Sequence, residues 1–275
     1  MLLLFIPCLT IIREMYEYTE VPEYPCIVAS HHDWVVVYKP RGMHSSAHGS
    51  ETEHVLMTWA VSTMPELSRV TGYWEHDYGL LHRLDRETAG LLLIAKTQEF
   101  FDYLANSKTV LLKKLYSLHA EINPFGLKGS IPLLYVPKGL SNEQWLEMLT
   151  MQDMSSVQNL LPHEIASLFR AYGKGRALVA CRVPHSIDKY NHSWSKTWYT
   201  THILACELRD RYFLMNIMLE RGFRHQIRAH CAWMGLPLVG DQLYNTQAQP
   251  GDTLSLVACG LEFTDFTGNR HRIML

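Results

Sequence analysis

One stretch of the chain, residues 80–96, reads L-L-H-R-L-D-R-E-T-A-G-L-L-L-I-A-K and places a carboxylate, Asp85, between two arginines at the edge of an apolar run. An exposed aspartate titrates near pH ~4 and is therefore ionised at neutral pH. A nearby arginine keeps a carboxylate ionised even where water is removed. Such a carboxylate can act as a nucleophile or as a base. The alternative interpretation is a structural ion pair or a turn aspartate.

A second stretch, R-G-F-R-H-Q-I-R-A-H, is densely cationic and begins at the expected N-terminus of a helix. Arg224 and Arg228 are four residues apart and share a helical face, and Arg221 and His225 form the neighbouring pair. Both features favour binding of a phosphate or a carboxylate, although a solvated basic face has the same pattern. His225 and His230 are five apart, which is poor spacing for two metal ligands on one helix.

A third candidate is Tyr116 in K-K-L-Y, inside an expected strand. A buried tyrosine usually belongs to the core and has a satisfied hydroxyl group. Its ring can also be a flat platform on which a nucleobase stacks. The residue by itself leaves both interpretations open.

The elements around these residues indicate how they are positioned. The continuous apolar run 91–94 predicts a strand covered on both faces, so Asp85 is expected in a loop at the mouth of a core strand. Residues 26–44 read as two short strands around a His-His-Asp turn, and the second strand stops at Lys39-Pro40-Arg41-Gly42. We further expect helices over 52–63 and 98–106 and a strand over 113–120.

Residues 124–195 differ in character. Ser141 and Gln144 match a capping box that opens a helix, and Met148, Met151 and Met154 fall on roughly one face, which is typical of core filling. A second helix is expected from about residue 162 to residue 173. Strand patterns return after residue 198 and again near the C-terminus. Strands outnumber helices without strict alternation, which predicts an α+β fold with a mixed sheet.

Composition bounds the class of protein. A length of 275 residues suits one large domain or two small ones. The formal net charge of -2 argues against a protein that coats polyanions over its whole surface, but it allows a local basic cleft. The six cysteines form no C-x-x-C pair, so free thiols in a reducing cytosol are expected. The apolar N-terminus is too short to span a bilayer; a core strand or docked extension, a weak signal sequence and a misassigned start are the alternatives.

Taken together, these segments resemble the RluA-type pseudouridine synthases. H-R-L-D-R-E-T-A-G-L-L-L resembles that family's catalytic motif H-R-L-D-x-x-T-S-G-L-L-L, and Y-K-P-R-G-M resembles its K-P-x-G turn. K-K-L-Y resembles its K-x-Y segment, and G-F-R-H-Q-I-R-A-H followed by G-L-P-L-V-G-D-Q-L-Y resembles its G-R-x-H-Q-I-R-x-H and G-x-P-I-x-G-D-x-x-Y block. The four motifs occur in the family's order, over roughly residues 27–116 and 197–263.

The resemblance implies a catalytic domain over residues 26–275, preceded by an extension over 1–25, with a mixed, largely antiparallel sheet, flanking helices and a catalytic cleft. It implies that Asp85 is the catalytic aspartate, that Tyr116 stacks on the target uracil and that Arg228 pairs with Asp85. It also implies substrate-binding roles for seven further residues: Arg83, which would face the RNA, with His82, Lys39, Lys114, Arg224, His225 and Gln226.

The activity that the resemblance implies is isomerisation of uridine to pseudouridine in ribosomal or transfer RNA, with no metal or other cofactor. We expect a monomer in the cytoplasm, without a membrane or an obligatory protein partner. Whether the aspartate attacks C1′ or C6, or removes a proton from the sugar, stays open. A non-catalytic RNA-binding or RNA-folding protein on the same scaffold is the first alternative. A hydrolase with an aspartate nucleophile is the second, and Glu87 is its only candidate for a second acid or base.

The chain departs from the family pattern at three places. T-A-G replaces T-S-G, and Phe223 stands where arginine is usual, so one phosphate contact is expected to move or disappear. If the alignment holds, Phe223→Arg should be tolerated. Residues 124–195 exceed the usual connection and read as an insertion. This insertion either adds an RNA-gripping surface through Lys174, Arg176 and Arg182 or is only a structural cap.

Overall fold

The structure is a computed structural model that describes residues 22–47, 54–107, 109, 111–124, 135–174, 178–183 and 194–275. The apolar N-terminus, most of the expected extension 1–25, and Arg176 lie outside the described residues. No helix in the described ranges is long and apolar enough to cross a membrane.

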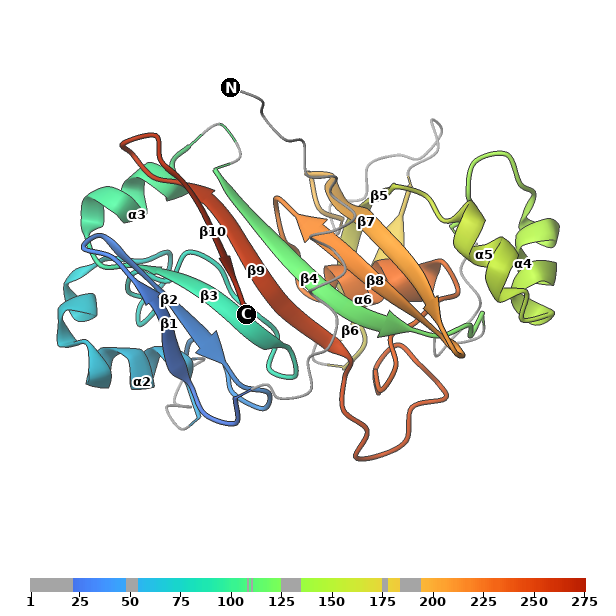
Figure 1. The fold of residues 1–275 in the computed structure, drawn as a ribbon, viewed down its shortest axis with the longest axis horizontal. Helices are drawn as coiled ribbons and strands as arrows, with labels where there is room; N and C mark the ends of the chain where they lie inside the picture. The colour runs from blue at the N-terminus through green and yellow to red at the C-terminus, as the bar shows by residue number, and fades with distance from the viewer. Residues whose placement is uncertain are drawn as a thin grey trace, which may run out of the picture.

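Within these ranges ten strands form one sheet in the order β1-β2-β3-β9-β4-β8-β7-β5-β6, with β10 paired to β9 (Figure 1). Among the pairings of these ten strands only that of β3 with β9 is parallel, over two residue pairs. The expected α+β class with a mixed, largely antiparallel sheet is confirmed. The strands are β1 (Cys26–Ser30), β2 (Trp34–Lys39), β3 (Ala89–Ala95), β4 (Leu112–Ala120), β5 (Glu164–Tyr172), β6 (Leu178–Arg182), β7 (Tyr199–Arg209), β8 (Tyr212–Leu219), β9 (Leu256–Thr264) and β10 (Arg270–Met274).

The helices flank this sheet at both ends and behind its middle. Figure 1 shows α2 and α3 beside β1, β2 and β3, α4 and α5 at the opposite end, and α6 against the strands between them. Their bounds are α2 (Leu56–Thr63), the 3-10 helix η1 (Pro65–Arg69), α3 (Gln98–Ala105), α4 (Asn142–Thr150), α5 (Met154–Leu160) and α6 (Gln226–Trp233). The expected capping box of α4 is confirmed, since Ser141 and Gln144 bond each other's backbone N–H groups.

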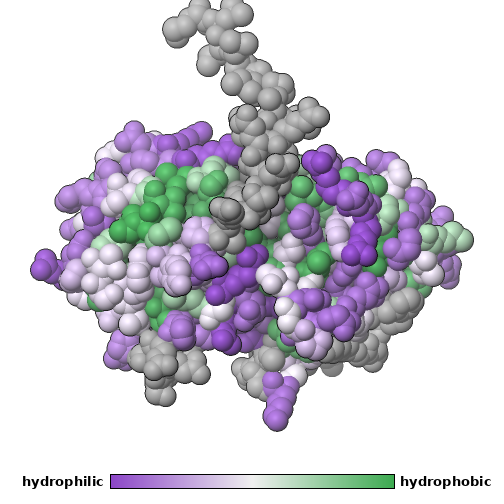
Figure 2. All heavy atoms as spheres, turned by 60° about the horizontal axis from the view of Figure 1, so that its bottom comes forward, coloured by the Kyte–Doolittle hydropathy of each residue, from purple (hydrophilic) through white to green (hydrophobic). Residues whose placement is uncertain are grey.

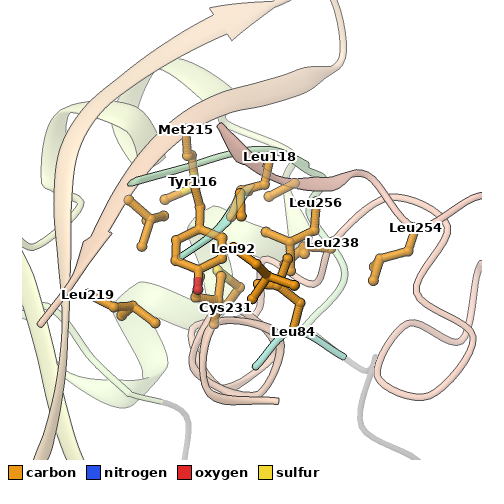
Figure 3. Close-up of a cluster of buried hydrophobic side chains, with 14 of the residues drawn as sticks. Leu84, Leu92, Tyr116, Leu118, Met215, Leu219, Cys231, Leu238, Leu254 and Leu256 are labelled. Atoms are coloured by element: carbon orange, nitrogen blue, oxygen red, sulfur yellow. The ribbon is translucent and has the colours of Figure 1, made fainter. Parts of the chain in front are cut away.

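Every residue of β2 and β3 is buried, as the apolar run 91–94 predicts. The largest core cluster extends from β2 and β3 through β4 and β8 to α4 and α6. Figure 3 shows the ring of Tyr116 inside this cluster, among buried side chains that include Leu84, Leu92 and Leu219. The core therefore reaches the segment that carries Asp85 from one side and the segment that carries Arg228 from the other.

Two expectations for residues 124–195 are wrong. The helix predicted over residues 162–173 is the strand β5, because the free edge of β7 pairs with it and residues 165, 167 and 169 turn toward one face. Proline and glycine bound a strand as well as a helix, so they did not distinguish the two.

The three methionines also do not share one buried face, although the sequence predicted it. Met148 and Met154 pack against the core, but Met151 is 72% exposed because α4 ends before it and α5 begins after it.

The surface is mixed in character. Figure 2 shows hydrophobic side chains gathered toward one side of the face it draws, with hydrophilic side chains around them. The distribution of polar and apolar side chains does not by itself mark a site on this face. The site follows from the arrangement of particular side chains in a cleft.

Candidate active site

A cleft of about 980 Å³ opens where three segments of the chain converge. One wall comes from residues 80–88, the loop that precedes β3. The opposite wall comes from residues 219–228, which lead from β8 into α6, and Tyr116 and Lys114 contribute from β4 between them. The three stretches that the sequence singled out for chemistry therefore meet in one place.

The Asp85 loop is held by the turn that follows β2. The Ser45 hydroxyl donates to the Leu84 carbonyl at 2.9 Å and accepts the Leu84 N–H at 2.9 Å. The N–H of Gly42 donates to the carbonyl of Arg86 at 2.9 Å. Residues on both sides of Asp85 are thus bonded to the turn, so the backbone that carries the carboxylate has a defined position.

Lys39 contributes to this support and does not line the cleft. Its side chain is fully buried, and Nζ donates to the carbonyls of Pro40, Met43 and Arg86 at 2.9, 2.8 and 3.2 Å. Burial lowers the pKa of Lys39 to about 7, although the negative charges of Asp85 and Glu87 act to raise it. Because all three donors of its ammonium group bond carbonyls, this placement argues against the expected direct contact of Lys39 with the substrate.

Gly90 lets β3 approach β9 just after the Asp85 loop. Its φ of +130° lies in the region that favours glycine, and a Cβ there would meet the carbonyl oxygen of Ala258 at 2.3 Å. The close approach connects the Asp85 loop to β9, which pairs on its other edge with the strand of Tyr116. A glycine is therefore required at this position of the T-A-G motif.

The Asp85 carboxylate faces two groups from α6 and its N-terminus. Its Oδ2 lies 3.7 Å from Nη1 of Arg228 and 3.9 Å from Nε2 of His225, and the side chain is 23% exposed. Burial raises the pKa of Asp85 above its ordinary value, while the charges of Arg228 and Arg224 oppose the rise. The structure thus brings together Asp85 and Arg228, as the resemblance implies.

Sequence reasoning missed the residue that orients Arg228. The wholly buried carboxylate of Asp241 accepts from Nε of Arg228 at 2.8 Å and from Nη2 at 2.6 Å. It also accepts the N–H groups of Leu243 and Tyr244. Burial lowers the pKa of Arg228, but the hydrogen bond and charge of Asp241 outweigh burial and raise it. This bidentate pair leaves Nη1 directed at Asp85. The signal was present as G-D-Q-L-Y, in which Gly240, at φ +73°, turns the chain.

His225 is held neutral beside the carboxylate. Burial, with the charges of Arg228 and Arg224, lowers its pKa to about 3. Its Nδ1 lies 3.0 Å from the hydroxyl of Tyr244, which also accepts the N–H of Val179 at 2.8 Å. A neutral imidazole can exchange hydrogen bonds with a substrate at Nε2 without adding charge. Tyr244 is a second residue that sequence reasoning missed, and it belongs to the same G-D-Q-L-Y block.

Tyr116 lines the cleft from β4 and is almost completely buried. Burial raises its pKa, and the charge of Asp85 raises it further, so the phenol keeps its proton. Figure 3 shows the ring flanked by apolar side chains. A neutral ring at the floor of a cleft matches the stacking role that the resemblance implies.

Two of the expected substrate-binding residues have their side-chain atoms engaged by the backbone. Nε2 of His82 accepts the N–H of Leu93 at 3.2 Å, and burial lowers the pKa of His82 to about 3. Gln226 is buried: Oε1 accepts the N–H of Phe223 at 2.9 Å, and Nε2 donates to Thr200 and Thr201. Both residues border the cleft, but Gln226 organises the start of α6 and has little left to offer a substrate.

The remaining expected contacts lie where a substrate could reach them. Lys114 donates to the carbonyl of Glu220 at 2.7 Å, and burial lowers its pKa to about 8. Arg83 and Arg224 are exposed on opposite walls of the cleft. Glu87 is not among the residues that line the cleft; it is exposed and lies 3.9 Å from Nε of Arg86.

Phe223 has a packing role that the sequence did not indicate. Its ring stacks on Phe169 of β5, with centroids 5.0 Å apart and planes 8° from parallel, and meets Tyr199 edge-on. The expectation that Phe223→Arg is tolerated is therefore not supported, because arginine would insert a charge into this aromatic cluster. The departure from the family pattern at residue 223 is explained by a partner from residues 124–195.

Comparison with known proteins agrees with the resemblance that the sequence motifs indicate. Residues 33–233 match the model of a family described as RNA pseudouridylate synthase. The uncharacterized RNA pseudouridine synthase YlyB of Bacillus subtilis is 26% identical over 215 residues, which cover 77% of this chain and 55% of that one. The ribosomal large subunit pseudouridine synthase D of Yersinia pestis is 24% identical over 233 residues, which cover 82% of this chain and 54% of that one.

The fold is also similar to that of a solved structure, human RNA pseudouridylate synthase domain containing 1. The TM-score is 0.56 at 17% identity, over 92% of this chain and 83% of that one. The chain spans about half the length of the curated relatives it matches.

Proposed function

The chain belongs to the RNA pseudouridylate synthase family, and from this membership we propose that it isomerises specific uridines in RNA to pseudouridine, with Asp85 as the catalytic residue. The observation that supports this most is the Asp85 carboxylate on the wall of the cleft, 3.7 Å from an arginine that a second, buried carboxylate holds in place. Ribosomal RNA is the first candidate substrate, because three of the relatives are named for the large ribosomal subunit.

The charges of the cleft support a polyanionic substrate. The chain as a whole has a formal net charge of -2. The cleft, in contrast, is bordered by six arginines and lysines and by two aspartates: Arg83, Arg86, Lys114, Arg221, Arg224 and Arg228, with Asp77 and Asp85. A cationic cleft on a nearly neutral body attracts the RNA backbone to one place on the molecule.

The proposed reaction begins with a flipped nucleotide. A uridine stacked in RNA hides its glycosidic bond, so it must leave the stack, at a cost of a few kcal/mol. Phosphate contacts to the exposed arginines and stacking of uracil on Tyr116 offset that cost. The neutral phenol of Tyr116 and the apolar side chains around it exclude water from the reacting base.

Asp85 then supplies its carboxylate to the nucleotide, while Arg228 stabilises the negative charge. The bond between C1′ and N1 breaks, the uracil rotates, and a new bond forms between C1′ and C5. The hydrogen on C5 leaves as a proton and N1 gains one, so the reaction is a redox-neutral isomerisation. The geometry is compatible with attack at C1′ or C6 and with removal of a sugar proton.

A second candidate function is RNA binding without catalysis. The exposed arginines on both walls would serve that function equally well. The buried pair of Arg228 with Asp241 argues for catalysis, because it orients a guanidinium toward Asp85 rather than toward the mouth of the cleft.

We place the activity in the cytoplasm, since the five cysteines within the described residues are all free.

The test is the variant Asp85→Asn. We expect it to abolish tritium release from RNA that carries 5-tritiated uridine, since the amide is neither nucleophile nor base, and to leave RNA affinity within about twofold. Glu87→Gln is the matched control: it removes a neighbouring exposed carboxylate that does not line the cleft, and it should turn over at the parent rate. Parent-rate turnover by Asp85→Asn would refute the role of Asp85. Loss of turnover in Glu87→Gln would instead favour a two-carboxylate mechanism.

A further inference from the structure

The cleft carries an aromatic side chain on its rim that the reaction at Asp85 does not use. Trp74 lines the cleft and is 71% exposed, and among the described residues no ring contact is made by its indole. Its neighbour Tyr73 also lines the cleft, but that ring is fixed against Phe101, with centroids 5.1 Å apart. An unpaired tryptophan at the mouth of a cationic cleft exposes apolar area that a flat ligand can cover.

The loop that presents Trp74 is tightly built. At its start, Gln98 accepts the N–H of Thr71 at 2.8 Å and donates to the Thr71 carbonyl at 3.3 Å. At its end, the Gly79 carbonyl accepts the N–H of Ala95 at 2.8 Å. A Cβ on Gly79 would meet the Ala95 carbonyl oxygen at 2.0 Å, so only glycine permits this anchoring.

The interior of the same loop holds unusual backbone conformations. His76 and Tyr78 have φ values of +67° and +48°, in the left-handed backbone region that residues other than glycine rarely adopt. Strained positions of this kind persist only where the surrounding structure determines them. The loop thus holds Trp74 in a defined place at the rim, which lowers the entropy that a bound ligand has to offset.

We propose that Trp74 is a stacking platform for the base of an unpaired nucleotide next to the uridine that enters the cleft. This inference rests on the proposed function, in that the polymer in the cleft is RNA. Arg83 also lines the cleft and is exposed, so a phosphate can meet a guanidinium while the adjoining base covers the indole. Single-stranded nucleic acid is bound by this combination of cations and aromatic faces. The target uridine is therefore in an unpaired loop and not in a continuous duplex.

The experiment measures RNA affinity in the Asp85→Asn background, so that it does not depend on turnover. The probe is a fluorescein-labelled RNA stem–loop with a uridine-containing loop of seven nucleotides. We expect Trp74→Ala to weaken binding about tenfold, the usual effect of removing one stacking ring, and Trp74→Phe to retain most of the affinity. Tyr24→Ala is the control, because Tyr24 is 74% exposed and does not line the cleft.

A second measurement identifies stacking rather than general contact. Single abasic nucleotides are placed in turn through the loop of the probe. One position is expected at which loss of the base weakens binding to the Trp74-containing protein about tenfold and has no further effect on Trp74→Ala. The proposal is overturned if Trp74→Ala binds the probe as tightly as the Asp85→Asn protein that keeps Trp74. It is also overturned if the loss of affinity is the same at every abasic position. If the protein with Asp85 intact forms no pseudouridine while these binding results hold, the proposed function is wrong and the stacking platform is retained.

Discussion

At the scale of single residues, the protonation of Asp85 depends on charges from three separate parts of the chain. Burial raises its pKa, and the charges of Arg228, Arg224 and Lys39 act against that rise, whereas Asp241 adds to it. Arg228 is buried and paired with Asp241, and Lys39 is enclosed by carbonyls. Arg224 is the exposed member of this set, so its charge can be removed without opening the core.

We expect Arg224→Gln to move the acid limb of the rate profile to higher pH. The proposed reaction needs ionised Asp85, so the rate rises as pH increases through the pKa of this carboxyl. Because burial already raises that pKa, the limb lies above the ordinary aspartate value of pH ~4. Loss of the Arg224 charge raises the pKa further. Single-turnover pseudouridine formation at saturating RNA, followed against pH, measures the shift.

Arg224→Lys is the matched control, because it keeps the charge and should keep the limb in place. A limb that stays fixed in Arg224→Gln, or that moves to lower pH, would show that Asp85 is not the group whose ionisation limits the rate.

At the scale of elements, the turn after β2 and the loop before β3 act as one unit. The Lys39 ammonium joins them through three carbonyls, and Ser45 joins them through two further hydrogen bonds. The K-P-R-G turn is therefore a support for the Asp85 loop. Its place in the chain, far from Asp85 in sequence, is explained by the antiparallel pairing of β2 with β3.

Lys39→Met should reduce kcat much more than RNA affinity. Methionine keeps most of the side-chain volume but leaves the carbonyls of Pro40 and Met43 without their donor, at a cost of about 3 kcal/mol in the free energy of unfolding. The Arg86 carbonyl keeps the N–H of Gly42 but loses its bond to Lys39, which loosens the Asp85 loop, so the carboxylate is held less firmly. Urea unfolding, single-turnover rates and RNA titrations measure the three quantities.

Lys96→Met is the control for this element, since Lys96 lies just beyond the other end of β3 and donates to a single exposed carbonyl, that of His31, at 3.1 Å. It should change neither rate nor stability appreciably. An equal loss of RNA affinity and kcat in Lys39→Met would point instead to direct contact of Lys39 with the substrate, as the motif alone suggested.

At the scale of the whole molecule, we propose that the described parts of residues 124–195 belong to the body of the catalytic domain. Trp145 of α4 is completely buried and donates from Nε1 to the carbonyl of Met234 at 3.0 Å. Ser167 of β5 lies 2.8 Å from Nε2 of His230 in α6. These contacts favour the structural cap over an RNA-gripping surface. Arg182 stacks on Trp194, with its guanidinium 5.5 Å from the ring centre.

Trp145→Ala should lower the free energy of unfolding of the whole protein by about 3–5 kcal/mol, in a single transition. The indole fills the main core cluster next to α6, so its loss leaves a cavity beneath the helix that carries Arg228. Chemical denaturation followed by both fluorescence and circular dichroism checks this. Met151→Ala is the control within the same segment and should be neutral. A separate early transition in Trp145→Ala would show that the segment unfolds by itself and is a detachable insertion.

Local patterns in the sequence were sufficient for much of this protein. The apolar run of β3, the K-P-R-G turn, the capping box of α4 and the cationic start of α6 each depend on neighbouring residues, and the structure contains all of them. The motifs also indicated the three segments that meet at the cleft. The sequence was less able to predict the role of each residue within its segment, as Lys39 and Gln226 show. A polar side chain in a motif can face either the substrate or the backbone of another segment.

The sequence by itself thus determined the family and the fold class and indicated the acidic residue of the candidate site, since these follow from residue types at short spacing. Only the tertiary structure decided that Asp241 orients Arg228, that β5 is a strand, that Phe223 belongs to an aromatic cluster and that Trp74 lines a cleft shared with segments distant in the chain. Each of these depends on a partner far away in the chain, and the free energy of such a contact exists only once folding has brought the two segments together.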